Sequence, residues 1–301
     1  MMWRHLVQQW IQQSAQQKML GMVAEAQRAA QYRFADPEVQ AAFAREQRCE
    51  IAVLFALGVE AGGTVDLLQN AVSMRCPNFV EHAGELGGRR VALVETGTGR
   101  QAAAAAAEDV IALHRPGWII SAGFAGGLRA GLRHGHIVMV DVVLDTAQRQ
   151  FSLGLHIGLE ALKSSPALHV GPLLTVDRLA RTVAEKRQLS ESCSALACDM
   201  ETLAVVEICQ REKVRCLAIR IITDTLEEEI PKEVERLLDQ KSLAARLGAA
   251  TGALLNRPSS LKDMWQLKEE ALKASDRLGR FLVGVIGQLD PRLPLDSSPG
   301  G

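Results

Sequence analysis

The chain has 301 residues, of which 48% are hydrophobic, and its 34 basic residues nearly balance its 35 acidic residues. This length and composition suit one sizeable hydrophobic core with an appendage. The near-neutral charge, without runs of basic residues broken by aromatic ones, argues against a nucleic-acid partner held through its phosphates and favours a small-molecule ligand.

Six cysteines are scattered along the chain without a Cys-x-x-Cys pair, and the histidines form no His-Glu-x-x-His motif. We therefore expect reduced, buried cysteines and no bound metal. No apolar run approaches the roughly 18 residues of a membrane span, and glutamines interrupt the N-terminal segment, so no integral membrane segment is expected. The predicted location is cytoplasmic.

Residues 1–48 are predicted to form a helical N-terminal extension. Apolar residues recur at helical spacing in the first 20 positions while glutamines fill the other face, which is typical of an amphipathic helix. A second helix is expected from Met22 to Tyr32. We expect the apolar face to pack on the domain or on a second subunit, with attachment to a membrane surface as the alternative. That face consists of Trp3, Leu6, Val7, Trp10 and Ile11.

Residues 49–258 change in character, because short apolar runs alternate with helical patterns. The runs are continuous rather than alternating, which indicates strands of a sheet covered on both faces. Strand–helix alternation predicts an α/β fold, in which ligands collect at the carboxyl ends of strands. The predicted strands are Ile51–Ala56, Arg90–Glu95, Trp118–Ala122, Ile137–Leu144, Val170–Thr175 and Cys216–Thr223, and the predicted helices are Gly99–His114, Asp177–Gln188 and Met200–Lys213.

The chain after Asp224 reads as an acidic linker, Glu227-Glu228-Glu229, followed by helical patterns. C-terminal helices are predicted within residues 259–290, and the Pro- and Gly-rich tail of residues 291–301 is predicted to be disordered. The expected helices are Val234–Leu238, Leu243–Leu255, Leu261–Leu272 and Leu278–Leu289.

Three acidic residues stand where chemistry is expected in such a fold. Asp224 ends an apolar strand, where a carboxyl group partly removed from water is suited to donate a proton to a purine N7. Glu201 opens a helix and can accept two hydrogen bonds from ribose hydroxyls. Glu60 follows the first strand and can deprotonate a water. Capping is the structural alternative for Glu201 at its helix N-terminus and for Asp224 at the turn after its strand, and a glutamate without a functional role is the alternative for Glu60.

Two glycine-rich segments follow predicted strands. Gly97-Thr98-Gly99 can bring backbone N–H groups close to a ligand at a helix start, although the full Gly-x-Gly-x-x-Gly pattern is absent and a plain tight turn is equally consistent. The segment 122–127 is predicted to be a small-residue turn that lets the backbone approach a flat ligand, with Phe124 stacking on it. Close helix–strand packing is the alternative.

These segments, in this order from about Ile51 to Asp224, resemble the purine nucleoside phosphorylase and methylthioadenosine/S-adenosylhomocysteine nucleosidase superfamily. The resemblance implies a central mixed twisted β-sheet flanked by helices, with helical N- and C-terminal extensions. It also implies an N-glycosidase without a cofactor, and a homodimer. The acidic linker, Asn256-Arg257-Pro258 and the segment 174–178 are similar to the hopanoid-associated branch, which is associated with removal of adenine from adenosylhopane.

The resemblance also assigns roles by position. Asp224 and Glu60 match the catalytic positions, the first as the acid that protonates the purine and the second as the glutamate that activates water. Glu201 matches the acceptor of the ribose hydroxyls. The remaining substrate-binding positions implied by the resemblance are Met200 against the sugar, Arg220 in support of the catalytic aspartate, Leu179 beside the purine, and Phe124, Ala125 and Gly126 in the small-residue segment.

Phe124 bears on the type of reaction. Phosphorylases of this superfamily commonly have a serine or threonine in the small-residue turn, where its hydroxyl holds phosphate, and a phenyl ring cannot replace that donor. Arg100 is the alternative phosphate ligand. We predict water as the nucleophile, and a nucleosidase that releases adenine from a 5′-substituted adenosine such as methylthioadenosine, S-adenosylhomocysteine or adenosylhopane. A phosphorylase and a nucleoside-binding module without turnover stay open as alternatives.

Overall fold

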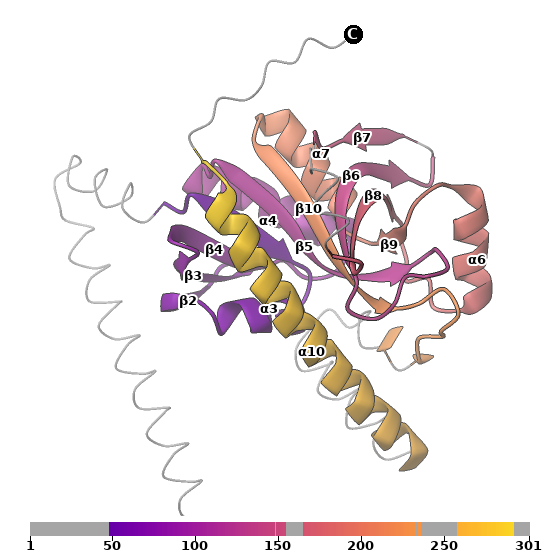
Figure 1. The fold of residues 1–301 in the computed structure, drawn as a ribbon. Helices are drawn as coiled ribbons and strands as arrows, with labels where there is room; N and C mark the ends of the chain where they lie inside the picture. The colour runs from indigo at the N-terminus through magenta and orange to yellow at the C-terminus, as the bar shows by residue number, and fades with distance from the viewer. Residues whose placement is uncertain (1–47, 148, 155–164, 233, 236–257, 292–301) are drawn as a thin grey trace, which may run out of the picture. The chain divides into compact units, whose positions relative to one another are not determined.

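The computed structural model describes residues 48–147, 149–154, 165–232, 234–235 and 258–291 (Figure 1). The helices predicted within residues 1–32 and 243–255, most of the one predicted at 234–238, and the tail after Pro291 lie outside these residues. In the part of the chain that is described, no helix combines the length and the apolar character that a bilayer span requires.

The strands of the described residues form one mixed sheet with the order β10-β6-β8-β9-β5-β1-β4-β3-β2, and β7 pairs with β6. Because β10 also pairs with β5, the strands β10, β6, β8, β9 and β5 close into a ring from which β1, β4, β3 and β2 extend. The predicted α/β fold is confirmed. The strands are β1 Ile51–Phe55, β2 Gln69–Arg75, β3 Val80–Leu86, β4 Arg89–Glu95, β5 Trp118–Gly127, β6 Ile137–Asp145, β7 Gln150–Ser152, β8 Leu168–Thr175, β9 Ala197–Asp199 and β10 Arg215–Asp224.

All six predicted strands are present, and four further strands were missed. The residues of β2 are exposed throughout, and β3 carries several polar residues, so neither has the apolar run that marks a buried strand. The other two, β7 and β9, have three residues each. Their pairing with neighbouring strands, rather than their own sequence, makes them strands.

The prediction of a turn after Ala122 is wrong, because β5 continues as strand through Gly127. Residues 220–224 of β10 pair with residues 123–126 along one edge of this segment. Along the other edge, Gly126 and Gly127 pair with β9. Strands on both sides hold the small residues extended, so the carboxyl end of β5 lies in the middle of the sheet.

Helices cover both faces of the sheet (Figure 1), as the continuous apolar strands predict. Ile51, Val53 and Phe55 of β1 pack with residues of α10, whereas Ala52 and Leu54 pack with residues of α4. The helices are α3 Gly58–Val65, α4 Arg100–His114, α6 Val183–Ser192, α7 Thr202–Glu212 and α10 Pro258–Gln288.

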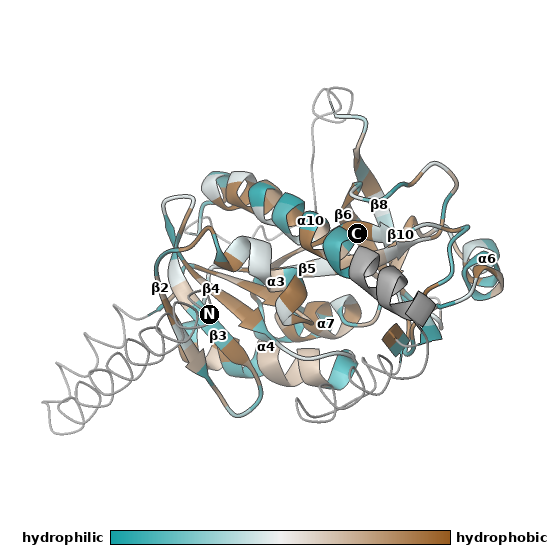
Figure 2. Cartoon of the chain, turned by 90° about the horizontal axis from the view of Figure 1, so that it is seen from below, coloured by the Kyte–Doolittle hydropathy of each residue, from teal (hydrophilic) through white to brown (hydrophobic). Residues whose placement is uncertain are grey.

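The C-terminal helix α10 is one continuous helix instead of the two that were predicted. No glycine or proline separates the two predicted segments, so nothing in the sequence breaks the helix. Its buried stripe recurs every four residues, and mixed hydrophilic and hydrophobic positions alternate along it in Figure 2. The stripe consists of Ala274, Leu278, Leu282 and Ile286.

Two glycines let α10 pack closely against α3. A Cβ at Gly63 would lie 2.5 Å from the carbonyl oxygen of Ser275, and a Cβ at Gly279 would lie 2.5 Å from the carbonyl oxygen of Gly63. The Ser275 hydroxyl donates to the carbonyl of Glu60 at 3.0 Å and accepts from the Gly63 N–H at 2.8 Å. The C-terminal helix therefore supports the helix that carries Glu60.

Candidate active site

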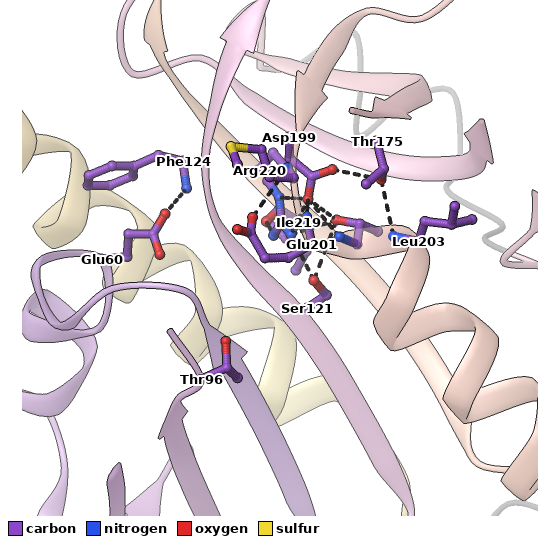
Figure 3. A network of polar contacts seen from close by, with 12 residues as sticks. Glu60, Thr96, Ser121, Phe124, Thr175, Asp199, Glu201, Leu203, Ile219 and Arg220 are labelled. Carbon is purple, nitrogen blue, oxygen red and sulfur yellow. Dashed lines mark hydrogen bonds and ion pairs between the residues drawn. The ribbon is translucent and has the colours of Figure 1, made fainter. Parts of the chain in front are cut away.

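Glu60 lies in the first turn of α3, a helix that the sequence interpretation did not include. Its Oε2 accepts a hydrogen bond from the N–H of Leu57 at 2.8 Å, and its Oε1 accepts one from the N–H of Phe124 at 2.8 Å (Figure 3). Burial raises the pKa of the Glu60 carboxyl group, and the hydrogen bond from Phe124 opposes this rise. A raised pKa suits a group that must take a proton from water near neutral pH.

Glu201 immediately precedes α7, so it stands at the start of this helix as predicted, and its Oε1 accepts the N–H of Gly99 at 2.6 Å. Burial first, and the negative charge of Asp199 second, raise the pKa of Glu201 to about 8. The Gly97–Gly99 segment thus holds a carboxylate of the protein itself at the start of α4. The predicted approach of this backbone to a ligand is replaced by a contact with Glu201.

Asp199 and Arg220 form a buried ion pair beside Glu201 (Figure 3). The guanidinium donates to Asp199 Oδ2 from Nε at 3.2 Å and from a terminal nitrogen at 2.8 Å. It also donates to the Ser121 hydroxyl at 2.7 Å. The sequence analysis predicted that Arg220 supports Asp224. In the structure Arg220 pairs with Asp199 instead, and Asp224 lies four residues further along β10.

Asp224 stands at the carboxyl end of β10, and its Oδ2 lies 2.6 Å from the Nζ of Lys186, a side chain of α6 with no solvent exposure. Thr223 donates to Asp224 Oδ1 at 3.2 Å. The sequence interpretation missed Lys186 because a single lysine in a short helix is usually exposed. Lys186 lies three residues from both Val183 and Leu189, which puts the three side chains on one face of α6. This spacing could have indicated that Lys186 is buried.

Two glycines of β5 make room for two of the acids. A Cβ at Gly123 would lie 2.8 Å from Oε1 of Glu60, and a Cβ at Gly126 would lie 2.9 Å from Oδ2 of Asp224. Any larger residue would collide with the carboxylate at either position. The glycines that the sequence interpretation assigned to contact with a flat ligand therefore mark where carboxylates approach the strand.

Glu60 and Glu201 line one small cavity of about 10 Å³. A space of this size holds about one water molecule. Asp224 does not line this cavity, so the structure brings two of the three predicted acids to one cavity. The carboxylate of Asp224 lies beside Gly126 of β5, three residues beyond the Gly123 that lies beside Glu60. The other lining residues are Leu54, Phe55, Ala56, Thr96, Ala103, Ser121, Ala122, Gly123, Phe124, Val205 and Arg220.

Three other predicted contact residues do not line this cavity. Leu179 lines a second cavity, of about 550 Å³, between the end of β8 and α6, a size typical of small-molecule sites. Met200 packs in a cluster with Leu128 and Cys198, and Ala125 is buried in the core. Within the described residues, no group of three or more His, Cys, Asp or Glu side chains is arranged to hold a metal ion.

The sequence model of the Phosphorylase superfamily matches residues 50–256. The 5′-methylthioadenosine/S-adenosylhomocysteine nucleosidase of Haemophilus influenzae (strain PittGG) is 26% identical over 199 residues, which are 58% of this chain and 86% of that protein. The nucleosidase of the same name from Shewanella piezotolerans (strain WP3 / JCM 13877) is 23% identical over 220 residues, or 66% of this chain and 96% of that protein.

Solved structures resemble the fold over most of the chain. The 5′-methylthioadenosine/S-adenosylhomocysteine nucleosidase of Campylobacter jejuni superimposes with a TM-score of 0.62 at 17% identity, covering 80% of this chain and 100% of that one. The nucleosidase from Colwellia psychrerythraea 34H, solved in complex with adenine, gives a TM-score of 0.60 at 20% identity, covering 82% of this chain and 98% of that one. At these identities the likeness establishes a shared fold.

Proposed function

Because this chain belongs to the Phosphorylase superfamily, whose sequence model matches residues 50–256, we propose that it is an N-glycosidase that releases adenine from an adenosine-type nucleoside, with water as the nucleophile. The curated relatives named above are nucleosidases of methylthioadenosine and S-adenosylhomocysteine, which supports this broad activity. The observation that carries the proposal is the water-sized cavity shared by Glu60 and Glu201.

In the proposed reaction each acid has one task. The O–H bond of the Asp224 carboxyl group breaks as its proton bonds to purine N7, and the electron pair of the glycosidic bond stays with adenine. The sugar becomes oxocarbenium-like, Glu60 removes a proton from water, and the water oxygen bonds to the anomeric carbon. Oε1 of Glu201 accepts from the N–H of Gly99 at 2.6 Å and Oε2 accepts from the N–H of Met200 at 3.3 Å, so Oε2, with the longer contact, is the oxygen proposed to accept from a ribose hydroxyl.

The substrate is proposed to lie along the carboxyl end of β5. A strand advances about 3.3 Å per residue, so Gly123 beside Glu60 and Gly126 beside Asp224 are about 10 Å apart. A nucleoside is an elongated ligand of two joined rings, and its sugar and its base can meet the two acids in turn. Because the cavity beside Glu60 holds only about one water, nucleoside binding requires the surrounding side chains to separate.

The contacts at the start of α4 favour water over phosphate. Arg100 donates to the carbonyl of Thr175 at 2.9 Å and pairs with Asp177 at 3.1 Å, so its guanidinium already has protein acceptors. The adjacent N–H of Gly99 is bound to Glu201. A phosphate at this helix start would have to displace the Glu201 carboxyl group from the N–H of Gly99.

The direct test measures adenine release by the full chain from methylthioadenosine, S-adenosylhomocysteine and adenosylhopane, with and without added phosphate. We expect release without phosphate, and a sugar product that keeps its 5′ substituent and carries a free anomeric hydroxyl rather than a 1-phosphate. Release that depends strictly on phosphate would favour the phosphorylase alternative. Binding of the nucleosides without any release would favour the non-catalytic binding module.

We also propose a hopanoid-type substrate and a homodimer. The hopanoid-type substrate rests on the resemblance of the acidic linker and of residues 256–258, and a rate on adenosylhopane well above the rate on methylthioadenosine would support it. The homodimer rests on the superfamily resemblance alone. Light scattering of the purified chain, with a mass twice that of one chain, would support it, and a monomer fully active at assay concentration would contradict it.

A further inference from the structure

Lys186 is a fully buried lysine outside the set of residues that the sequence analysis assigned to the reaction. Its Nζ donates to the carbonyl oxygens of Thr225 and Glu228, each at 2.8 Å, and lies 2.6 Å from Oδ2 of Asp224. These two carbonyls accept two of the three N–H donors of the ammonium, and the charge of the ammonium is paired with Asp224. Such a group stays charged in the protein interior only because its partners replace water.

The surroundings of Asp224 make Lys186 its main electrostatic partner. From β9, the buried Cys198 thiol faces it, and burial first and the charge of Asp224 second raise the pKa of that thiol. From β5, Gly126 lies beside it, and a Cβ there would be 2.9 Å from Oδ2. In the loop after β10, the Glu228 carboxylate contacts His134 at 2.6 Å instead. The cation on α6 is therefore the charged side chain that contacts the Asp224 carboxylate directly.

The two oxygens of the Asp224 carboxylate have different partners: Oδ1 accepts from the Thr223 hydroxyl at 3.2 Å, and Oδ2 faces Lys186. Oδ2 of Asp224 accepts no aligned hydrogen bond from any described residue, so its contact with the Lys186 ammonium is a charge contact. The ammonium is anchored by the carbonyls of Thr225 and Glu228, which follow Asp224 in the chain. Lys186 thus connects the end of the catalytic strand to α6 and fixes where the carboxylate lies.

We propose that Lys186 is a positioning residue that holds Asp224 in place and balances the negative charge that develops on Asp224 when its proton passes to the purine. The proposal rests on the proposed function. In the step, the carboxyl O–H bond breaks, the N7–H bond forms, the glycosidic electron pair leaves with adenine, and Lys186 keeps all its protons. A fixed cation beside developing negative charge stabilises the transition state more than the ground state.

Removal of the cation makes Asp224 a weaker acid. Without Lys186 the carboxyl group holds its proton to higher pH, because nothing offsets the cost of a buried negative charge. A weaker acid gives up its proton less readily to the leaving purine, so kcat falls. The pH at which activity declines on the alkaline side rises at the same time. A role confined to folding would produce neither change in a variant that folds.

The first experiment compares Lys186→Gln and Lys186→Met with wild type on the substrate that wild type cleaves best. We expect kcat lower by about 10- to 100-fold with KM changed little, and the alkaline limb of kcat/KM moved up by about one pH unit. Lys186→Arg keeps the charge and should keep the wild-type pH limb. Arg187→Gln is the matched control, because the neighbouring Arg187 makes an exposed pair with Glu227 at 2.6 Å.

The second experiment uses 4-nitrophenyl ribofuranoside, whose leaving group departs without protonation. We expect the Lys186 variants to cleave it at nearly the wild-type rate, because Asp224 has no proton to give in that reaction. An equal fall on both substrates, or an unchanged pH limb on the nucleoside, would overturn the role of Lys186 while adenine release by wild type upholds the proposed function. A wild-type chain that releases no adenine overturns both.

Folding of each variant is checked by urea unfolding. Lys186→Gln retains an amide that can donate to the carbonyls of Thr225 and Glu228, so it serves if Lys186→Met does not fold. We expect the stability deficit of either variant to shrink on acidification, because protonation of Asp224 removes its uncompensated charge. In an Asp224→Asn background, a Lys186 substitution leaves no carboxylate without its cation, so it should cost less stability than it does in wild type. An equal loss of stability in the two backgrounds would contradict the pairing.

Discussion

Among the described residues, the carboxylate–cation pairs of Asp199 with Arg220 and of Asp224 with Lys186 differ in how many donors each carboxylate receives. Asp199 accepts from the guanidinium, from the N–H of Thr202 at 2.8 Å and from the Thr175 hydroxyl at 2.8 Å. Asp224 receives one side-chain hydrogen bond, from Thr223 at 3.2 Å, and the charge of Lys186.

The difference separates a structural carboxylate from a reactive one. Each lone pair of Asp199 that holds a donor is unavailable to a proton or a ligand, and the network joins the ends of β8 and β9 and the interior of β10 to the start of α7. Asp224 keeps acceptor capacity at the carboxyl end of a central strand, beside a cation that stabilises its anion. The following predictions test whether function and stability divide between the two pairs in this way.

The largest effect is expected from Asp224→Asn, which removes the carboxyl group of the pair with fewer hydrogen-bond donors, Asp224 with Lys186. The rate of adenine release should fall by about 10²- to 10⁴-fold, because an amide has no acidic proton for N7, while nucleoside binding is largely kept. Steady-state kinetics and calorimetric binding measure the two quantities. Glu227→Gln, at an exposed carboxylate near the same loop, is the control. Retention of the wild-type rate in Asp224→Asn would remove the contrast between the pairs.

Arg220→Met should act on stability. It leaves the buried Asp199 carboxylate without its cation, and breaking a buried pair from one side costs about 3–5 kcal/mol of unfolding free energy. Urea unfolding measures the loss, and Arg187→Gln, at an exposed pair, should change the same quantity by less than about 0.5 kcal/mol. If Arg220→Met lowers the unfolding free energy by as little as the control does, the hydrogen-bond network around Asp199 contributes little to folding.

Gly126→Ala tests how tightly β5 confines Asp224. The new Cβ would lie 2.9 Å from Oδ2 of Asp224, so the carboxylate or the strand must move. Overpacking of this kind costs about 1–3 kcal/mol of stability, and displacement of the acid should lower kcat more than it raises KM. Gly131→Ala is a comparison variant with open space around the added Cβ, although its φ of +94° adds backbone strain. Unchanged kcat in a folded Gly126→Ala variant would contradict the confinement.

The smallest effect concerns the pH dependence contributed by Glu201, whose pKa is raised to about 8 in the folded chain by burial first and by Asp199 second. An unfolded glutamate titrates near about 4.3. Its contribution to stability is therefore fully present below that pH and is lost as the pH rises through about 8.

Glu201→Gln removes this dependence. Between pH 4 and pH 8, the unfolding free energy of wild type should fall by about 1–2 kcal/mol relative to that of the variant. This is less than the pKa shift alone would give, because Glu201 is partly exposed. Urea unfolding at a series of pH values measures the difference. Parallel stability curves for the two proteins would show that Glu201 titrates normally.

The sequence predicted the architecture better than it predicted the contacts. The six apolar strands and the superfamily are confirmed, because burial on both faces demands continuous apolar runs that are visible in one dimension. The exposed strand β2 has no such run, and it exists because β3 pairs with it. The hopanoid-type substrate and the roles of the site residues stay predictions.

Local sequence by itself determined which residues are acids and where small residues stand: Glu60, Glu201 and Asp224 near the ends of apolar strands, and glycines in the segment 122–127. The tertiary structure alone decided which charges meet. Arg220 pairs with Asp199 across β9 and β10, and Lys186 reaches Asp224 from a helix almost 40 positions earlier in the chain. Hydrophobic periodicity records only whether a residue faces the core, whereas the partner of a buried charge depends on strand register and helix placement, which no single segment encodes.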